Sequence, residues 1–187
     1  MVELVEKLLA IHDALRERSL PHAFGGAIAL AYCVEEPRGT RDLDLNVFCD
    51  AAEAAKVLAA LPDGVRVTDK DVAAVKRDGQ ARLFWDGVPV DVFLDNIPLH
   101  REVAAAIVWV PLADRTIPVL DCASLVVFKS LFDRTKDWAD IEAVAVAAPE
   151  DVVAAAATIA GLVGTDDPVH ERLAAIMRRG AVAPHRA

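Results

Sequence analysis

Polar and apolar residues alternate along one short segment of the chain, from Asp42 to Val47. Successive side chains of a strand point to opposite faces, so this pattern predicts a strand. On that geometry Leu43, Leu45 and Val47 enter a core. Asp42 and Asp44 then project together from the other face, which makes them the first candidates for chemistry.

The rest of the N-terminal part mixes helical and strand periodicity. Apolar residues every three or four positions predict a surface helix over residues 3–17. Further helices are predicted over residues 27–34, 51–61 and 100–107, the second of them capped by Asp50. Besides the strand that runs from Asp42 to about Phe48, strands are predicted over residues 22–24, 65–67, 81–85, 88–94, 109–112 and 116–120. Asp86-Gly87 is typical of a tight hairpin turn between two of these strands.

From Asp121 onward the pattern is helical. Helices are predicted over residues 121–133, 137–147, 150–161 and 168–179, with a loose tail over 178–187. Asp137 suits the N-cap of the second of these helices, and Asp140 its first turn. We therefore expect an α+β fold, in which a mixed sheet flanked by helices (residues 1–120) is followed by a helical C-terminal subdomain (residues 121–187).

Composition narrows the function classes. The chain has 187 residues, of which 55% are hydrophobic, and this excludes a mainly disordered protein. Its formal net charge is −9, whereas proteins that bind nucleic acid over a broad surface are usually basic. RNA would have to meet a local positive patch, for which the candidates are Arg38, Arg41, Lys129, Arg134 and Lys136.

The cysteines and the apolar stretches suggest a cytoplasmic protein. Cys33, Cys49 and Cys122 lack metal-ligand spacing, and we expect them as buried free thiols in a reducing compartment. The longest apolar stretch, residues 141–163, is interrupted by Pro149-Glu150-Asp151 and does not suit a membrane span. No membrane partner is therefore expected.

Asp42 and Asp44 suggest a metal site. Two adjacent like charges repel each other, and a divalent cation such as Mg²⁺ with hard oxygen ligands relieves that repulsion. The bland alternative is the solvated face of an edge strand. Asp91 alternates with Val90 and Val92 and is the candidate third carboxylate, either a general base or a metal ligand. Asp95 shares its strand face but stands in a turn-like sequence, so Asp91 is favoured.

Other polar positions fit phosphate binding. Gly25-Gly26 lies between a predicted strand and a predicted helix, where backbone approaches a ligand closely or simply makes a turn. The Thr40 hydroxyl suits a phosphate oxygen or the stabilisation of its own loop. Lys129 stands at the margin of an apolar helix face, where it either reaches water or holds a triphosphate. Lys136 is free to reach a ligand.

In these residues the chain resembles the nucleotidyltransferase superfamily typified by DNA polymerase β. The signature there is Gly-[Gly/Ser], a helix, Asp-x-Asp on a strand, and a third carboxylate on a later strand. Gly25-Gly26, Asp42-Leu43-Asp44 and Asp91 match it in order. More narrowly, the chain resembles the AbiEii and MenT group of bacterial toxin nucleotidyltransferases. The matching segments there are Thr40-Arg41-Asp42-Leu43-Asp44, Lys129, and Arg134-Thr135-Lys136-Asp137-Trp138-Ala139-Asp140.

The resemblance implies a nucleotidyltransferase-like fold and Mg²⁺-dependent transfer of nucleotides from an NTP to the 3′ end of tRNA. It implies the toxin of a toxin–antitoxin pair, with a cognate antitoxin that in some systems phosphorylates the residue at the place of Thr40. By the same resemblance Asp42, Asp44, Asp91 and Lys129 are the catalytic candidates, and the first three hold the metal. Gly25, Gly26, Thr40, Lys129 and Lys136 are the nucleotide-binding candidates.

Two alternatives stay open. One keeps the chemistry and changes the acceptor to a small molecule, as in aminoglycoside resistance, or to a protein. The acidic chain suits a cationic acceptor better than RNA. The other is a non-catalytic interaction module of the same fold.

Overall fold

The computed structural model describes residues 2–36 and 39–182. The chain divides into two compact units, one made of Met1–Ile28 and Gly39–Leu120, the other of Ala29–Arg38 and Asp121–Ala187. The sequence pattern suggested a single cut after Leu120. Arg38, a member of the candidate positive patch, and the last residues of the predicted tail (183–187) lie outside the described residues.

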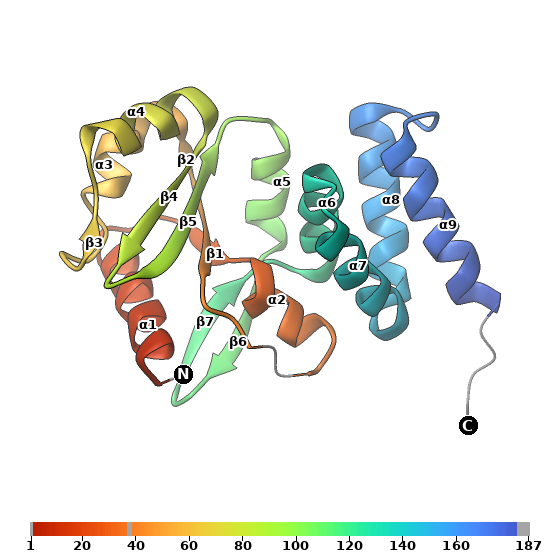
Figure 1. The fold of residues 1–187 in the computed structure, drawn as a ribbon, viewed down its shortest axis with the longest axis horizontal. Coiled ribbons are helices and arrows are strands. Elements are labelled where there is room, and N and C mark those ends of the chain that lie inside the picture. The colour runs from red at the N-terminus through yellow and green to blue at the C-terminus, as the bar shows by residue number, and fades with distance from the viewer. Residues whose placement is uncertain (1, 37–38, 183–187) are drawn as a thin grey trace. The chain divides into compact units, whose positions relative to one another are not determined.

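The described part of the first unit forms a mixed seven-stranded sheet in the order β3-β4-β5-β2-β1-β7-β6 (Figure 1). The strands are β1 His22–Phe24, β2 Leu43–Asp50, β3 Val65–Arg66, β4 Gln80–Trp85, β5 Val88–Asp95, β6 Val108–Leu112 and β7 Arg115–Val119. The central pair β2 and β5 is parallel, as are β1 and β7, and the other neighbours are antiparallel. The predicted α+β class with a mixed sheet is confirmed.

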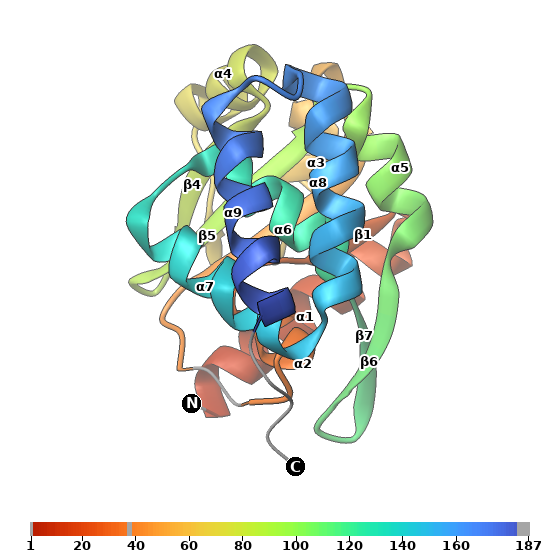
Figure 2. The ribbon, with the colours of Figure 1, turned by 90° about the vertical axis from the view of Figure 1, so that its right-hand side faces the viewer.

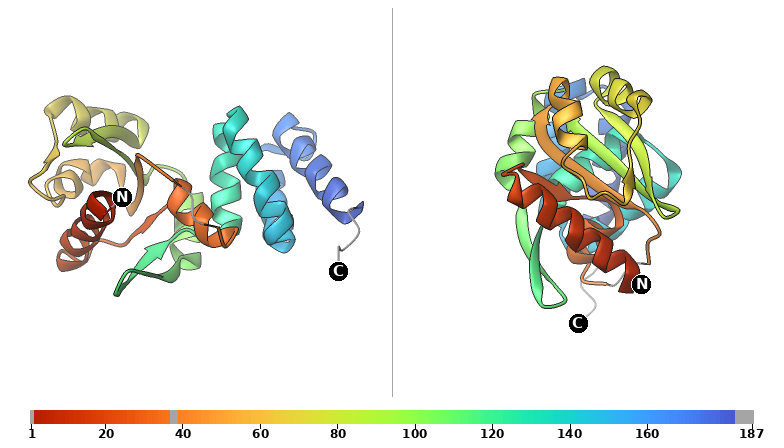
Figure 3. Two further views of the ribbon diagram at one scale, coloured as in Figure 1. Left: turned by 60° about the horizontal axis from the view of Figure 1, so that its bottom comes forward. Right: turned by 90° about the vertical axis from the view of Figure 1, so that its left-hand side faces the viewer.

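One face of this sheet carries the core. Leu43, Leu45 and Val47 of β2 are fully buried, as the alternation predicted. Helix α1 (Val2–Glu17) crosses this face, since its Lys7 lies over the Trp85 ring of β4 and its His12 bonds His22 of β1 (Figure 3, right). The aspartates that alternate with these core residues therefore project from the opposite face.

The remaining helices of the first unit are short. Asp50 caps the one-turn 3₁₀ helix Ala51–Glu53, which leads into α3 (Ala54–Leu58), so the predicted helix 51–61 is shorter and irregular. Helix α4 (Asp69–Asp78) was not predicted, because only Val75 of it is buried and its apolar periodicity is weak. Its ends are nevertheless well defined by a capping box and by a left-handed glycine. Helix α5 spans Leu99–Ala106.

The second unit is helical, as predicted. Its helices are α6 (Cys122–Phe132), α7 (Thr135–Ala147), α8 (Pro149–Val163) and α9 (Pro168–Val182), and α8 and α9 pack side by side (Figure 2). Helix α9 continues through residues 178–182, where a loose tail was predicted. Asp137 is not the N-cap of α7: the helix begins at Thr135, and the Asp137 carboxylate is bound by side chains instead of backbone N–H groups.

The prediction of three free thiols is wrong. Helix α2 (Gly26–Cys33) follows β1 and ends at Cys33, which forms a disulfide with Cys122 at the start of α6. The two half-cystines are 89 positions apart, so nothing in their local sequence indicated the pairing. Cys49 is free and partly buried. The disulfide removes the free-thiol argument for a reducing compartment.

Among the described residues, no helix combines the length and the apolar character that a membrane span requires.

Candidate functional site

The candidate site is a row of side chains that runs across three neighbouring strands of the first unit. Asp44 of β2 stands directly opposite Asp91 of the parallel strand β5. Asp91 in turn stands opposite Arg82 of the antiparallel strand β4. Neighbouring strands lie about 4.8 Å apart, so each of these side chains starts about 5 Å from the next one in the row.

The hydrophobic pattern explains why the row faces one side. The residues next to it along each strand, Leu43, Val90 and Leu83, are register partners of one another and are 0 to 1% exposed. Side chains alternate along a strand, so a buried row of leucine and valine on one face requires the adjacent Asp44–Asp91–Arg82 row to lie on the other.

The double glycine at the start of α2 makes room for Asp44. The Gly25 N–H donates a 2.8 Å hydrogen bond to the Asp44 carbonyl, which ties the turn to β2. Gly26 has a positive φ of 52°. A Cβ at this position would overlap the Asp44 carboxylate. Gly25-Gly26 was predicted either to approach a ligand or to make a turn. The structure contains the turn, and the turn places Asp44, a catalytic candidate, against the first turn of helix α2.

Asp42 lies just before β2 and is bound by its neighbour Thr40. The Thr40 hydroxyl donates a 2.6 Å hydrogen bond to the Asp42 carboxylate, Oγ1 to Oδ1. Both residues are partly buried. Thr40 therefore orients Asp42, and its predicted contact with a phosphate stays a prediction.

Arg82 is the member of the row that the sequence reasoning missed. Its Nε lies 2.7 Å from Asp91 Oδ1 and its Nη2 lies 2.6 Å from Asp91 Oδ2, so the guanidinium binds both carboxylate oxygens. This contact with Asp91, reinforced by the charges of Asp42 and Asp44, raises the pKa of Arg82 above its usual range. The charges of all three carboxylates thus act on one arginine, and the three acids form one region of negative potential.

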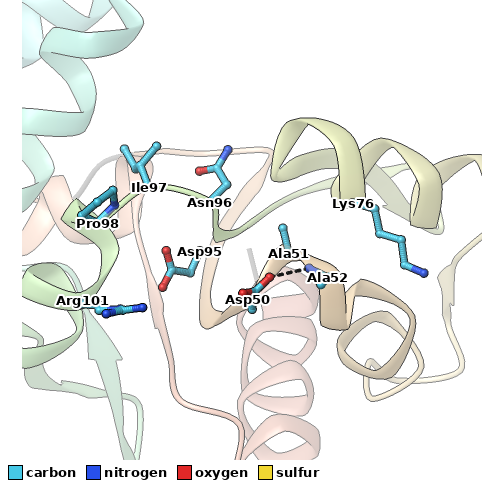
Figure 4. A pocket seen from close by; sticks show the side chains of 9 residues that line it. All are labelled: Asp50, Ala51, Ala52, Lys76, Asp95, Asn96, Ile97, Pro98 and Arg101. Atoms are coloured by element: carbon cyan, nitrogen blue, oxygen red, sulfur yellow. Dashed lines mark hydrogen bonds between the residues drawn. The ribbon is translucent and has the colours of Figure 1, made fainter.

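Asp95, the rival for the third carboxylate, lies elsewhere. It pairs in register with Asp50 at the far end of β2 and β5, four residues or about 13 Å along the strand from Asp91. There it lines an open pocket of about 490 Å³ together with Asp50, Lys76 and Arg101 (Figure 4). The register therefore favours Asp91, which stands directly beside Asp44.

Lys129 belongs to the second unit, where it is buried among carboxylates. Its Nζ lies 2.7 Å from Asp140 Oδ2 and 3.4 Å from Asp137 Oδ1. Burial opposes ionisation of Asp137, but hydrogen bonds and charges from Arg134 and Lys129 outweigh it and lower the pKa of this carboxyl. Two of the five cations in the candidate positive patch, Lys129 and Arg134, are therefore already paired with acids.

Lys136 and Arg41 are exposed, the first in α7 and the second just before Asp42. Lys136 is thus placed to meet solvent, as its predicted role requires. Its contact with a nucleotide stays a prediction.

No protein-family model matches the chain, and no curated protein matches it. Solved structures do match. The antibiotic-resistance factor ANT(2″)-Ia in solution has a TM-score of 0.62 at 17% sequence identity, over 86% of this chain and 94% of that one. ANT(2″)-Ia in complex with adenylyl-2″-tobramycin gives 0.55 at 16%, over 95% of this chain and 98% of that one. The lincosamide antibiotic adenylyltransferase LnuA with lincomycin bound gives 0.51 at 16%, over 74% and 94%.

The chain has a nucleotidyltransferase-like fold. This confirms the predicted nucleotidyltransferase-like fold. The narrower resemblance to the AbiEii and MenT toxins is not tested by these likenesses and stays a hypothesis.

The donor set of the nucleotidyltransferase-like sheet has the right chemistry for a divalent cation, but only in part the right arrangement. Carboxylate oxygens are the hard ligands that Mg²⁺ prefers, and Asp42 and Asp44 supply them from neighbouring positions. Within residues 2–36 and 39–182, however, no three His, Cys, Asp or Glu side chains are grouped so as to hold one ion. Both oxygens of Asp91 are directed at Arg82 instead.

Proposed function

We propose that this protein is a divalent-metal-dependent nucleotidyltransferase that transfers a nucleoside monophosphate from an NTP to an acceptor hydroxyl. The observation that carries the proposal is the register of Asp44 and Asp91 on adjacent strands of a nucleotidyltransferase-like sheet, with Asp44 against Gly26. Strand alternation alone would also produce a solvated acidic face, but it would not require a glycine turn shaped around one of the acids.

The reaction that these residues suit is an in-line displacement. The acceptor oxygen forms a bond to the α-phosphorus of the NTP, the bond from that phosphorus to the bridging oxygen breaks, and pyrophosphate leaves with its electron pair. Asp91 is the side chain that we place beside the acceptor, either as the general base for its proton or as a ligand of the cation, because a carboxylate beside the reacting atoms can serve in both roles. A cation held by Asp42 and Asp44 would neutralise charge on the phosphates.

For the acceptor we favour a cationic small molecule of the antibiotic class. The chain carries a formal net charge of −9, and the candidate row contains three carboxylates against one arginine. Such a field attracts polyamine-like acceptors and repels a polyanion. Of the proteins with similar folds described above, one is an antibiotic-resistance factor that has been solved with adenylyl-2″-tobramycin, and another is a lincosamide antibiotic adenylyltransferase, which supports the same class.

The direct test is transfer from each of the four α-labelled NTPs to separate acceptors. We would offer an aminoglycoside panel, a lincosamide and total tRNA, and read the products by mass and by gel. We expect labelled aminoglycoside or lincosamide with the wild type and none with Asp42→Asn or Asp44→Asn, each of which keeps side-chain size while removing a charge. Full transfer by either variant would remove the basis of the proposal.

Transfer to the 3′ end of tRNA by a toxin is the second candidate, and Thr40 is the observation that favours it. Its hydroxyl contacts the Asp42 carboxylate at 2.6 Å, so a phosphate on Thr40 would set about two further negative charges against that acid. An antitoxin that phosphorylates Thr40 would silence the site in this way. Labelled tRNA in the assay above, abolished by Thr40→Glu and retained by Thr40→Ser, would favour the toxin over the resistance enzyme.

A further inference from the structure

Arg82 binds Asp91, the carboxylate that a metal-dependent transferase would need at this site. The guanidinium engages both oxygens of this carboxylate, at 2.7 and 2.6 Å, in a fork-to-fork geometry that suits arginine and not lysine. It also stands in the same row as Asp44. In this arrangement the positive charge next to Asp91 comes from Arg82.

The same contact occupies the third carboxylate of the predicted metal site. Asp44 and Asp91 are register partners, so their separation along the sheet is no obstacle. Both Asp91 oxygens are engaged by Arg82, so an ion shared with Asp44 has to compete with Arg82 for them.

We propose that Arg82 is a resident counter-cation, a latch that occupies both oxygens of Asp91 until a divalent cation displaces it. Arg82 is then a positioning residue that competes with the metal for Asp91. This inference depends on one part of the proposed function, namely that the acids bind a divalent metal. It does not depend on which acceptor or which nucleotide the protein uses.

The position of Arg82 allows its side chain to leave Asp91. The Arg82 side chain is 56% exposed although Asp91 is only 16% exposed, so the acid is fixed in the sheet while the cation reaches it from solvent. Gln80 and Phe84, the neighbours of Arg82 on the same face of β4, are also exposed and leave space for the guanidinium to move. Ion pairs of this exposure contribute little free energy, and a divalent ion brings twice the charge of the arginine that it replaces.

The test is binding of Mn²⁺ alone, without nucleotide, followed by electron paramagnetic resonance of the free ion and by calorimetry. Mn²⁺ favours the same oxygen ligands as Mg²⁺ and is visible to the spectrometer. We would compare the wild type with Arg82→Gln, which removes the charge, and with Arg82→Lys, which keeps the charge and loses the fork. Arg77→Gln is the matched control, because Arg77 also binds both oxygens of an acid, Asp78, but on the outside of α4.

We expect Arg82→Gln to bind Mn²⁺ about tenfold more tightly than the wild type, the change that follows from removing a unit charge about 6 Å from a divalent ion in a water-like dielectric. Arg82→Lys should fall between the two, and Arg77→Gln should match the wild type. Thermal unfolding of each variant shows that the fold is intact. If Arg82 acted through its charge alone, Arg82→Lys would bind Mn²⁺ as the wild type does, and that result would overturn the latch.

Unchanged or weaker Mn²⁺ binding by Arg82→Gln overturns the latch while leaving the transferase proposal to the labelling assay. Absence of Mn²⁺ binding in every variant overturns the latch and the metal site together. Tightening in Arg77→Gln equal to that in Arg82→Gln would reduce the effect to net charge and also overturn the latch.

Discussion

Gly26→Ala tests whether the double glycine exists to place Asp44. The added methyl group is the smallest possible change, yet it meets two obstacles in this structure. Gly26 has a φ of +52°, a conformation that L residues rarely adopt, and its new Cβ would overlap the Asp44 carboxylate. Both must be relieved by movement of the turn, of Asp44, or of both.

The magnitude follows from the two obstacles. A left-handed backbone costs an alanine about 1–2 kcal/mol. Turning the Asp44 side chain away from its preferred rotamer adds about 1 kcal/mol. We therefore expect the free energy of unfolding to fall by about 2–3 kcal/mol. A misplacement of a reacting group by about 1 Å is enough to lower the rate about a hundredfold, so the transfer rate should fall by at least that factor.

Gly87→Ala is the matched control, because Gly87 also has a positive φ, +82°, but nothing lies within 4 Å of its Cβ position. It should lose about 1–2 kcal/mol of unfolding free energy, measured by urea denaturation, and keep the wild-type transfer rate. Equal losses of transfer in the two variants would show that strain alone matters, and the claim that Gly26 makes room for Asp44 would be refuted.

Three further predictions concern buried groups: a histidine, a disulfide and a lysine. Burial lowers the pKa of His22 to about 4, so the unfolding free energy should be fully present above the unfolded-state value of about 6.5 and fall by about 3 kcal/mol as pH drops through 4, measured by urea titration across this window. Cys33→Ser, which opens a disulfide across 89 positions, should remove about 4 kcal/mol, whereas Cys49→Ser should change little. Lys129→Met should destabilise the protein by about 3 kcal/mol, because it leaves buried acids short of a partner, while exposed Lys136→Met should stay within about 0.5 kcal/mol.

The placement of the acids could be predicted from sequence because strand geometry is local. A period of two, read from Asp42 to Val47 and again around Asp91, is enough to put the acids on one side of a sheet and the leucines on the other. The choice of Asp91 over Asp95 had only turn chemistry to support it. The parallel register of β2 and β5 supplies the stronger reason, and no local pattern contains that register.

The errors have a different origin in each case. Helix α4 was missed although its signals are in the sequence: Thr68 and Asp71 form the capping box and Gly79 ends the helix. The disulfide and the burial of Lys129 were beyond sequence reasoning, since both depend on how separate helices pack. A lysine at the margin of an apolar face reaches water only if the neighbouring helix does not offer acids first, and α7 offers two.

Arg82, by contrast, could have been found. The turn Asp86-Gly87 has positive φ at both residues, as a two-residue hairpin requires, and it pairs Trp85 with Val88. Each step back along β4 is then matched by a step forward along β5, so three steps bring Arg82 opposite Asp91. An acid predicted on the functional face thus fixes its cross-strand partner as soon as the hairpin is recognised. That partner determines whether all three acids can share a cation or whether one of them, here Asp91, is already paired with an arginine.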